Sequence, residues 1–486
     1  MKIIRSFLIA VVILFQFAVC QNSIQDEINS FSKISQLKNA SISFLAIDLN
    51  ANETIAEFNS KTCLPSASTA KLFSTATALK VLGPNFQPST RIYVDGEINK
   101  EGILNGNIWV KGGGDPTLGS RFFNEKGKEN EFLQSWTDTL LKIGIKGVNG
   151  SVIVDGSDFS YQGAPDGWTW SDMGNYYGAG PSGIVIYDNM IQYHFKTSTT
   201  VGGKTRLTST FPKIENLKFD NQISSSSNMG DNSYIYGAPF SYNRFGIGTL
   251  PVNKDDFIVK GSLPDPELQM AIELTNSLIK KGINVIYKPN AYRLLKDSLN
   301  NNYTDFQLIL NHKGIKLKKI IEVTNLKSVN LFAEQLLFLI SKEQKEIGST
   351  LEGVKIVKEY WGNSIDLSGM NLTDGSGLSR SNGINASHFC QLLSTIYKFE
   401  NFEDFENSLP IAGFTGTLTN VCKNELGHGR IKAKSGTLNR VKSYAGYVDS
   451  KSGKKIAFAI IVNNYNCSSN QLVKYMEDVF NKLAIY

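Results

Sequence analysis

Three short motifs, in a fixed order and far apart, constrain this chain more than any other feature of its sequence. They are Ser68-Thr69-Ala70-Lys71, Ser328-Val329-Asn330 and Lys434-Ser435-Gly436-Thr437. Together they supply a nucleophilic hydroxyl, two amines that can act as a base or as a positive field, and a second hydroxyl with an amide. This set of groups suits attack on a carbonyl, provided that the fold gathers the three motifs in one place.

The first motif lies at the start of a predicted helix. Ser-x-x-Lys also occurs elsewhere, for example from Ser277 to Lys280, so the pattern alone is not specific. The copy at Ser68 differs because an apolar helical pattern follows it to Leu82 and ends at Gly83-Pro84. Residues three apart share a helical face, so we expect Lys71 to bring its amine beside the Ser68 hydroxyl.

The other two motifs lie at a predicted helix start and in a predicted strand. An apolar pattern of helical spacing follows Asn330, so Ser328 and Asn330 are expected to line a cleft. Lys434 to Thr437 lies in the first strand of a predicted β-meander. The missing side chain at Gly436 lets a substrate backbone approach this strand. A helix that begins near Asn470 is expected to cover the sheet.

The motifs, in this order, resemble those of the serine penicillin-binding proteins and serine β-lactamases. Longer stretches are similar to one branch, the class C penicillin-binding proteins, which are D-alanyl-D-alanine carboxypeptidases and endopeptidases. These stretches are Pro65–Leu72, Gly113–Leu118, Pro165–Trp170, Asn175–Ala179, Asp374–Arg380 and Ala433–Leu438. The chain departs from the family pattern at Ser435, where Thr is more common, and at Val329, where many relatives have Asp.

Spacing predicts a catalytic domain that is interrupted by an insertion. Ser68 and Ser328 lie about 260 positions apart, far more than a connection between neighbouring helices needs. We expect an α+β fold, with a β-lactamase/transpeptidase-like catalytic domain formed by residues 21–90 and 290–486. This domain would be an antiparallel sheet flanked by helices. The resemblance implies that residues 91–289 form two smaller, mainly β inserted domains.

The N-terminus predicts export from the cytoplasm. Lys2 and Arg5 precede an apolar run from Phe7 to about Cys20, which is typical of a secretory signal peptide at residues 1–20. We therefore expect a secreted, periplasmic protein with no stable membrane span after cleavage. An uncleaved anchor and a lipidated Cys20 are the alternatives. An oxidising compartment permits disulfides, and the sequence leaves open how Cys63, Cys390, Cys422 and Cys467 pair.

The net charge and the missing sequence motifs argue against other classes of protein. The net charge is +6, without a basic cluster that has interleaved aromatics, so we expect no nucleic-acid partner. The four histidines form no His-x-x-x-His pair and no Cys-x-x-Cys occurs, so neither a metal nor another cofactor is expected. A Gly-x-Ser-x-Gly elbow is also missing, which argues against a Ser-His-Asp hydrolase.

These residues suggest an acyl-enzyme mechanism. Ser68 would attack the substrate carbonyl, and Lys71, neutral because it is buried beside a second cation, would accept the proton. Ser328 would pass a proton to the leaving amine, Asn330 would hold Lys71 and a substrate amide, and Lys434 would supply positive field. The oxyanion would lie between the backbone N–H groups of Ser68 and Thr437.

Substrate binding is expected along the third motif and at two charged residues. The predicted substrate-binding strand comprises Ser435, Gly436, Thr437 and Leu438. The resemblance implies that Asp155 and Arg380 contact the two charged ends of a meso-diaminopimelic acid side chain. The alternatives are a turn-forming role for Asp155 and an internal ion pair for Arg380.

We therefore predict a serine D,D-peptidase, a carboxypeptidase, an endopeptidase or both, that acts on peptidoglycan stem peptides and is acylated by β-lactams. One alternative is a β-lactamase or esterase of the same fold, which needs fast deacylation. The other is a catalytically inactive scaffold that binds the cell wall, against which the intact motifs argue. The sequence does not decide between carboxypeptidase and endopeptidase, and it leaves the oligomeric state open.

Overall fold

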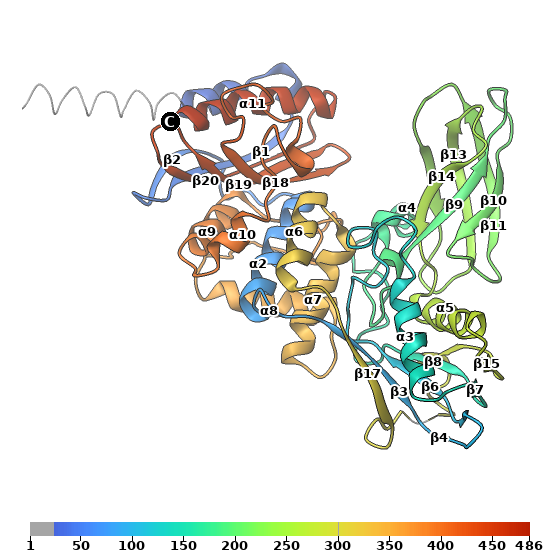
Figure 1. Cartoon of the computed structure of the whole chain (residues 1–486). Coiled ribbons are helices and arrows are strands. Elements are labelled where there is room, and N and C mark those ends of the chain that lie inside the picture. Colours follow the sequence, from blue (N-terminus) through green and yellow to red (C-terminus); the bar gives the residue numbers. More distant parts are fainter. Residues whose placement is uncertain (1–23, 300) are drawn as a thin grey trace, which may run out of the picture. The chain divides into compact units, whose positions relative to one another are not determined.

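The computed structural model describes residues 24–299 and 301–486, so the predicted signal peptide lies outside the described residues. The chain forms two compact units, each built from separate stretches of sequence (Figure 1). Among the described residues, unit 1 comprises residues 24–84, 321–329 and 354–486. Unit 2 comprises residues 85–320 and 330–353. The three motifs are therefore divided: Ser68, Ser328 and Lys434 belong to unit 1, and Asn330 begins a segment of unit 2.

Unit 1 is built around a five-stranded antiparallel sheet of spatial order β18-β19-β20-β1-β2. Its strands are β1 (Ser41–Asp48), β2 (Glu53–Phe58), β18 (Ile431–Leu438), β19 (Val441–Asp449) and β20 (Lys455–Asn463). Strand β20 is buried from Ile456 to Asn463 because both faces of the sheet are covered. Strands from the two ends of the chain meet here, since β1 pairs directly with β20.

Helices cover both faces of this sheet (Figure 1). Helix α11 (Ser469–Ile485) and the helical residues 24–32 pack on one face, around the buried rings of Phe44, Phe458 and Phe480. Helix α9 (Ala386–Tyr397) packs against β1, β19 and β20 from the other side. The chain also forms α2 (Lys71–Val81), α6 (Leu317–Lys327), α8 (Thr350–Gly362) and α10 (Phe402–Glu406). The predicted antiparallel sheet flanked by helices is confirmed.

Unit 2 holds several small sheets. One, of order β16-β8-β6-β3-β17, contains β3 (Ser89–Val94), β6 (Ile108–Lys111), β8 (Val152–Asp155), β16 (Asn290–Ala291) and β17 (Gln307–Lys313). Another, of order β15-β7-β5-β4, contains β4 (Glu97–Ile98), β5 (Ile103–Asn105), β7 (Gly147–Val148) and β15 (Asn284–Val285). Helices α3 (Glu131–Lys142) and α5 (Pro266–Lys280) pack together, with α5 also against β8 and β16. The fully buried Trp136 lies in this core.

The remaining strands of unit 2 form two three-stranded sheets. The first, of order β10-β9-β14, contains β9 (Met190–Lys196), β10 (Arg206–Phe211) and β14 (Phe257–Ser262). The second, of order β11-β13-β12, contains β11 (Lys218–Ser226), β12 (Asn232–Tyr236) and β13 (Asn243–Pro251). The short α4 (Trp170–Met173) contacts β12, and α7 (Asn330–Gln344) completes the unit. The division of residues 91–289 into two domains stays a prediction.

The start of the first helix differs from the expected single helix over residues 68–82. Residues Ala67–Ala70 form a 3-10 turn, and α2 begins only at Lys71. Ala67 has a left-handed φ of 49°, which separates the turn from the preceding extended segment. Tightened turns are frequent at helix N-termini, and hydrophobic spacing alone does not distinguish them from α-helix. Helix α2 is also buried from Lys71 to Leu79 rather than along one stripe.

Candidate active site

The first motif places a hydroxyl and a buried amine side by side. Nζ of Lys71 lies 2.9 Å from Oγ of Ser68 and donates to the carbonyl oxygen of Ser376 at 2.6 Å. Lys71 is fully buried, whereas Ser68 is partly exposed. Because burial removes the hydration of an ammonium ion, it favours the neutral amine. This pair can therefore transfer a proton from the hydroxyl to the amine.

A buried carboxylate shapes the loop that presents the Ser376 carbonyl. Asp374 is fully buried and accepts hydrogen bonds from the backbone N–H groups of Gly377 and Ser379, at 2.8 and 2.7 Å. The side-chain amide of Asn382 donates to the same carboxylate at 2.7 Å. These three hydrogen bonds to Asp374 fix the shape of the loop. The carbonyl oxygen of Ser376 is thereby held where it accepts the hydrogen bond from the Lys71 amine.

Two glycines allow backbone segments to approach the Ser68 turn closely. A Cβ on Gly377, where φ is 78°, would lie 1.9 Å from the carbonyl oxygen of Ala67. A Cβ on Gly436 would lie 2.5 Å from the carbonyl oxygen of Ser66 and 2.9 Å from the backbone nitrogen of Ser68. The third motif therefore needs glycine for a specific reason, which is the contact between strand β18 and the nucleophile turn.

The third motif pairs a second amine with a second hydroxyl. Nζ of Lys434 donates to Oγ of Ser328 at 2.9 Å and to the carbonyl oxygen of Ser435 at 2.8 Å. Burial lowers the pKa of Lys434 well below its usual value, and Lys71 and Lys442, when they are protonated, lower it further. Strand β18, which carries Lys434, packs against the turn that carries Ser68, so the two amine–hydroxyl pairs lie close to each other.

Strand β18 is an edge strand of its sheet. An isolated bridge from Ile411 to Lys432 covers the first part of its outer edge. From Ser435 to Leu438 that edge has no strand partner in the described part of the chain, and Thr437 is exposed. Free edge amides can bind an extended peptide or an oxyanion. The predicted substrate-binding strand is thus placed where such pairing is possible.

Lys442 is a residue of this site that the sequence reasoning did not find. It lies on β19 directly opposite Thr437, and its Nζ donates to Oγ1 of Thr437 at 2.9 Å. Burial lowers the pKa of Lys442 to about 8. A signal for it exists in the sequence, because two residues separate Leu438 from Val441, and a two-residue hairpin turn would set this register.

The other predicted site residues have the following placement. Asn330 is the first residue of α7 in unit 2, and its Nδ2 donates to the carbonyl oxygen of Tyr177 at 2.8 Å. Asp155 ends β8, also in unit 2. Arg380 is an exposed residue of unit 1 that directly follows the buried Ser379. The catalytic role of Asn330 and the substrate roles of Asp155 and Arg380 stay predictions.

The carboxylate of Asp155 is engaged within unit 2. It is fully buried, pairs with Nζ of Lys111 at 3.1 Å, and accepts hydrogen bonds from Tyr303 at 2.7 Å and Asn301 at 3.0 Å. Burial alone would raise the pKa of Asp155, but Lys111 and hydrogen bonds from Ser157 and Tyr303 lower it below the usual value. A substrate that binds this carboxylate would have to replace one of its partners.

One side-chain cluster in the described ranges has metal-ligand character. Ligand atoms of Cys422, Glu425 and Glu477 lie within 4.8 Å of one another. Nζ of Lys474, however, pairs with Glu477 at 2.6 Å and with Glu425 at 3.6 Å, so one of the two acidic charges is already compensated. Burial also raises the pKa of the Cys422 thiol, which keeps it protonated. These residues fit an ion-pair cluster better than a metal site.

Two structural features relate to the export hypothesis, the state of the cysteines and the length of the apolar helices. Cys63, Cys390, Cys422 and Cys467 are free thiols in the structure. Among the described residues, no helix is both long and apolar enough to span a membrane.

The chain is similar to known enzymes along almost its whole length. It is 27% identical over 473 residues to D-alanyl-D-alanine carboxypeptidase DacB from Haemophilus influenzae, covering 92% of each chain. It is 25% identical over 469 residues to D-alanyl-D-alanine carboxypeptidase from Actinomadura sp. strain R39, covering 91% of this chain and 81% of that one. The crystal structure of penicillin binding protein 4 (dacB) from Haemophilus influenzae has the same fold, with a TM-score of 0.79 at 24% identity over 94% and 99% of the two chains.

Fold, site and relatives together define a serine-type D,D-peptidase of the penicillin-binding protein class. Residues 24–483 match the model of the D-Ala-D-Ala carboxypeptidase 3 (S13) family, and the chain belongs to that family. The predicted family, the α+β fold class and the predicted activity as a D-Ala-D-Ala carboxypeptidase are thereby confirmed.

Proposed function

We propose that this D,D-peptidase cleaves stem peptides of peptidoglycan through an acyl-enzyme on Ser68. The observation that carries the proposal is the 2.9 Å separation between Nζ of the buried Lys71 and Oγ of Ser68. The second pair, Lys434 and Ser328, supplies a further hydroxyl and, when Lys434 is protonated, a positive field. Such a site needs no metal to activate its nucleophile.

In the acylation step, Oγ of Ser68 bonds to the carbonyl carbon of the penultimate D-alanine while its proton moves to the neutral amine of Lys71. The negative charge that develops on the carbonyl oxygen accepts hydrogen bonds from the N–H groups of Ser68 and Thr437. The C–N bond then breaks, and the leaving amine takes a proton from Ser328, which is replenished from the lysines. Terminal D-alanine leaves, and Ser68 carries the acyl group.

Deacylation repeats these steps with water in place of the hydroxyl. Lys71 takes a proton from water, the new hydroxide bonds to the acyl carbon, and the ester bond to Oγ breaks. The proton returns to Ser68 and restores the resting pair. The product is a stem peptide one residue shorter, with a new carboxylate.

Two lysines supply charge for the substrate carboxylate in this scheme. Lys434 is fully buried behind Ser328, whereas Lys442 reaches the hydroxyl of the exposed Thr437. A carboxylate bound beside Thr437 would gain a charge-assisted hydrogen bond from Lys442. We therefore add Lys442 to the predicted substrate-binding residues.

The same nucleophile would react with β-lactams. A β-lactam also presents a carbonyl and a nearby carboxylate, and the penicillin binding protein 4 from Haemophilus influenzae has been crystallised with one. Acylation of Ser68 followed by slow hydrolysis is the expected behaviour of a D,D-peptidase. Because stem peptides occur outside the cytoplasmic membrane, the predicted export signal agrees with a periplasmic enzyme.

A labelling and turnover experiment tests the proposal. The purified protein is incubated with a fluorescent penicillin and, separately, with a pentapeptide that ends in D-Ala-D-Ala. We expect a long-lived adduct and release of D-alanine, both lost by at least about 10⁴-fold in Ser68→Ala and Lys71→Ala. Lys280→Ala, in another Ser-x-x-Lys pair, is the control and should behave as the wild type. Rapid penicillin turnover would favour the β-lactamase alternative, and no adduct would favour the scaffold.

A further inference from the structure

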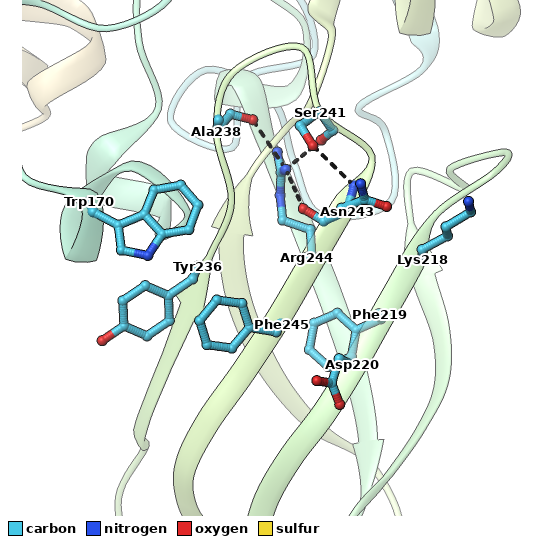
Figure 2. Close-up of a pocket in the computed structure, with 10 residues that line it drawn as sticks. All are labelled: Trp170, Lys218, Phe219, Asp220, Tyr236, Ala238, Ser241, Asn243, Arg244 and Phe245. Atoms are coloured by element: carbon cyan, nitrogen blue, oxygen red, sulfur yellow. Dashed lines mark hydrogen bonds between the residues drawn. The ribbon is translucent and has the colours of Figure 1, made fainter.

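A groove on unit 2 takes no part in the catalysis proposed above (Figure 2). It has a cavity volume of about 710 Å³ and lies at the end of the β11-β13-β12 sheet next to α4. Volumes of this size accommodate extended ligands of several rings. Its lining combines aromatic rings with charged and amide side chains.

Three aromatic rings form a row in this groove. Tyr236 and Phe245 are cross-strand partners, and their rings stack with centroids 4.7 Å apart and an angle of 8° between the planes. Trp170, from α4, adds a third ring whose centroid lies 6.0 Å from that of Tyr236. Trp170 is 50% exposed, an unusual degree for so large an apolar side chain. Exposed aromatic rows of this kind commonly mark binding surfaces.

A buried cation lies beside the rings. Arg244 is 3% exposed, and its Nη1 donates to the carbonyl oxygens of Ala238 and Asn243 at 3.2 Å each (Figure 2). Nε and Nη2 make no well-formed hydrogen bond. Burial lowers the pKa of Arg244 below its usual value, and the nearby Tyr193 hydroxyl opposes this shift in part. Across the described residues, no carboxylate pairs with this guanidinium. Arg244 therefore makes the groove electropositive.

Hydrogen-bond donors and acceptors lie on either side of the row of aromatic rings. The exposed Asp220 lies opposite Phe245 in the strand register, and its carboxylate accepts a hydrogen bond from Gln222 at 2.9 Å. The side chain of Asn243 is exposed and offers a donor and an acceptor together. A pyranose has an apolar C–H face and a rim of hydroxyls. The groove matches it, because the aromatic rings offer an apolar surface and have hydrogen-bond donors and acceptors at their edges.

We propose that this groove binds the saccharide strand of peptidoglycan and so holds the polymer while its stem peptides are cleaved. The inference rests on the proposed function in that it takes peptidoglycan as the substrate. The positive field of Arg244 and the exposed Lys218 favour a saccharide that carries carboxylates over a neutral one. Acetamido groups would pair with Asp220 and Asn243.

Titration calorimetry with soluble glycan strands, freed of peptides by an amidase, tests the inference. The full-length protein should bind them, and Trp170→Ala and Phe245→Ala should each weaken binding by about three- to tenfold. Tyr287→Ala is the matched control, because Tyr287 is an exposed aromatic residue of unit 2 outside the groove. Asp220→Asn, which keeps the side-chain shape, should weaken binding without changing the unfolding temperature.

The outcomes separate this inference from the proposed function. Ser68→Ala should bind glycan strands like the wild type, and the groove variants should release D-alanine from a soluble pentapeptide at the normal rate. Loss of peptide cleavage without loss of glycan binding would contradict only the proposed function. Absence of glycan binding by the wild type, or equal binding by Trp170→Ala, Phe245→Ala and Tyr287→Ala, would overturn the inference and favour a protein partner.

Discussion

The backbone nitrogen of Ser68 lies 2.9 Å from the position that a Cβ on Gly436 would occupy. The two residues come from opposite ends of the chain, and their contact brings strand β18 against the nucleophile turn. Thr437, which follows Gly436, is the second proposed oxyanion donor. The relative position of the two N–H groups therefore depends on a residue without a side chain.

Gly436→Ala should impair acylation more than stability. The added methyl group would push β18 away from the Ser68 turn, and loss of one oxyanion donor typically costs about 10² to 10³ in rate. Stopped-flow acylation by a fluorescent penicillin measures this rate. Gly230→Ala is the control, because a Cβ at Gly230 meets nothing within 4 Å. An acylation rate in Gly436→Ala equal to that of the control would contradict the proposed oxyanion site.

Lys442→Met should raise the KM for a D-Ala-D-Ala peptide by about three- to tenfold at pH 7, with little change in kcat. Because the pKa of Lys442 is lowered to about 8, its charge is lost as the pH rises through that value. The wild-type KM should therefore rise above about pH 8, and the KM of the variant should not. Lys451→Met, at an exposed turn, is the control. A variant with the pH profile of the wild type would exclude Lys442 from carboxylate binding.

The same lysine should influence how stability depends on pH. Its pKa is lower in the folded state, at about 8, than its usual 10.5, so the unfolded chain binds the proton more tightly. The free energy of unfolding should thus increase with pH between these two values. Lys442→Met should reduce that slope, as measured by denaturant titrations from pH 7 to pH 10. An unchanged slope would show that the lysine is solvated in the folded protein.

Asp374→Ala should destabilise unit 1 and slow acylation together. It leaves the buried N–H groups of Gly377 and Ser379 without their acceptor, at a cost of about 3 kcal/mol. The carbonyl of Ser376 would also lose its fixed position beside Lys71. Thermal unfolding and penicillin acylation measure the two effects. Asp366→Ala, in an exposed turn of the same unit, should change neither.

Asp155→Ala should lower the free energy of unfolding by about 2 kcal/mol, because Lys111 would lose its buried carboxylate partner and keep Asp158, at 2.9 Å, as its remaining ion pair. The pKa of Asp155 is lowered in the folded state, so its contribution is complete above the unfolded pKa and is lost as the pH falls through the folded value. The difference from the wild type should shrink below about pH 4. A raised KM with unchanged stability would instead support the predicted substrate role. Asp138→Ala, a surface pair, is the control.

Local patterns predicted most of the elements that carry the site. The meander around Lys434 and the helix that follows Ser468 appear where strand and helix patterns place them, because neighbours in sequence determine them. The i, i+3 spacing of Ser68 and Lys71 correctly brought their side chains together, although the backbone there is a 3-10 turn.

Long-range contacts could not be predicted in the same way. Nothing in the sequence near Lys71 indicates that the Ser376 carbonyl will accept its hydrogen bond, because 305 positions separate the two residues. Burial of Asp155 beside Lys111 depends on the parallel pairing of β6 with β8, which hydrophobic patterns do not specify.

The direct pairing of β1 with β20 has a consequence for the order in which the protein matures. During synthesis the first strand, β1, is made early, yet its partner β20 follows more than 400 positions later. Residues 85–320, by contrast, are contiguous and contain the hydrophobic core of unit 2. They can therefore fold while the rest of the chain is still being synthesised. The central sheet of unit 1, and with it the strand that carries Lys434, can therefore form only after residues 455–463 have been made.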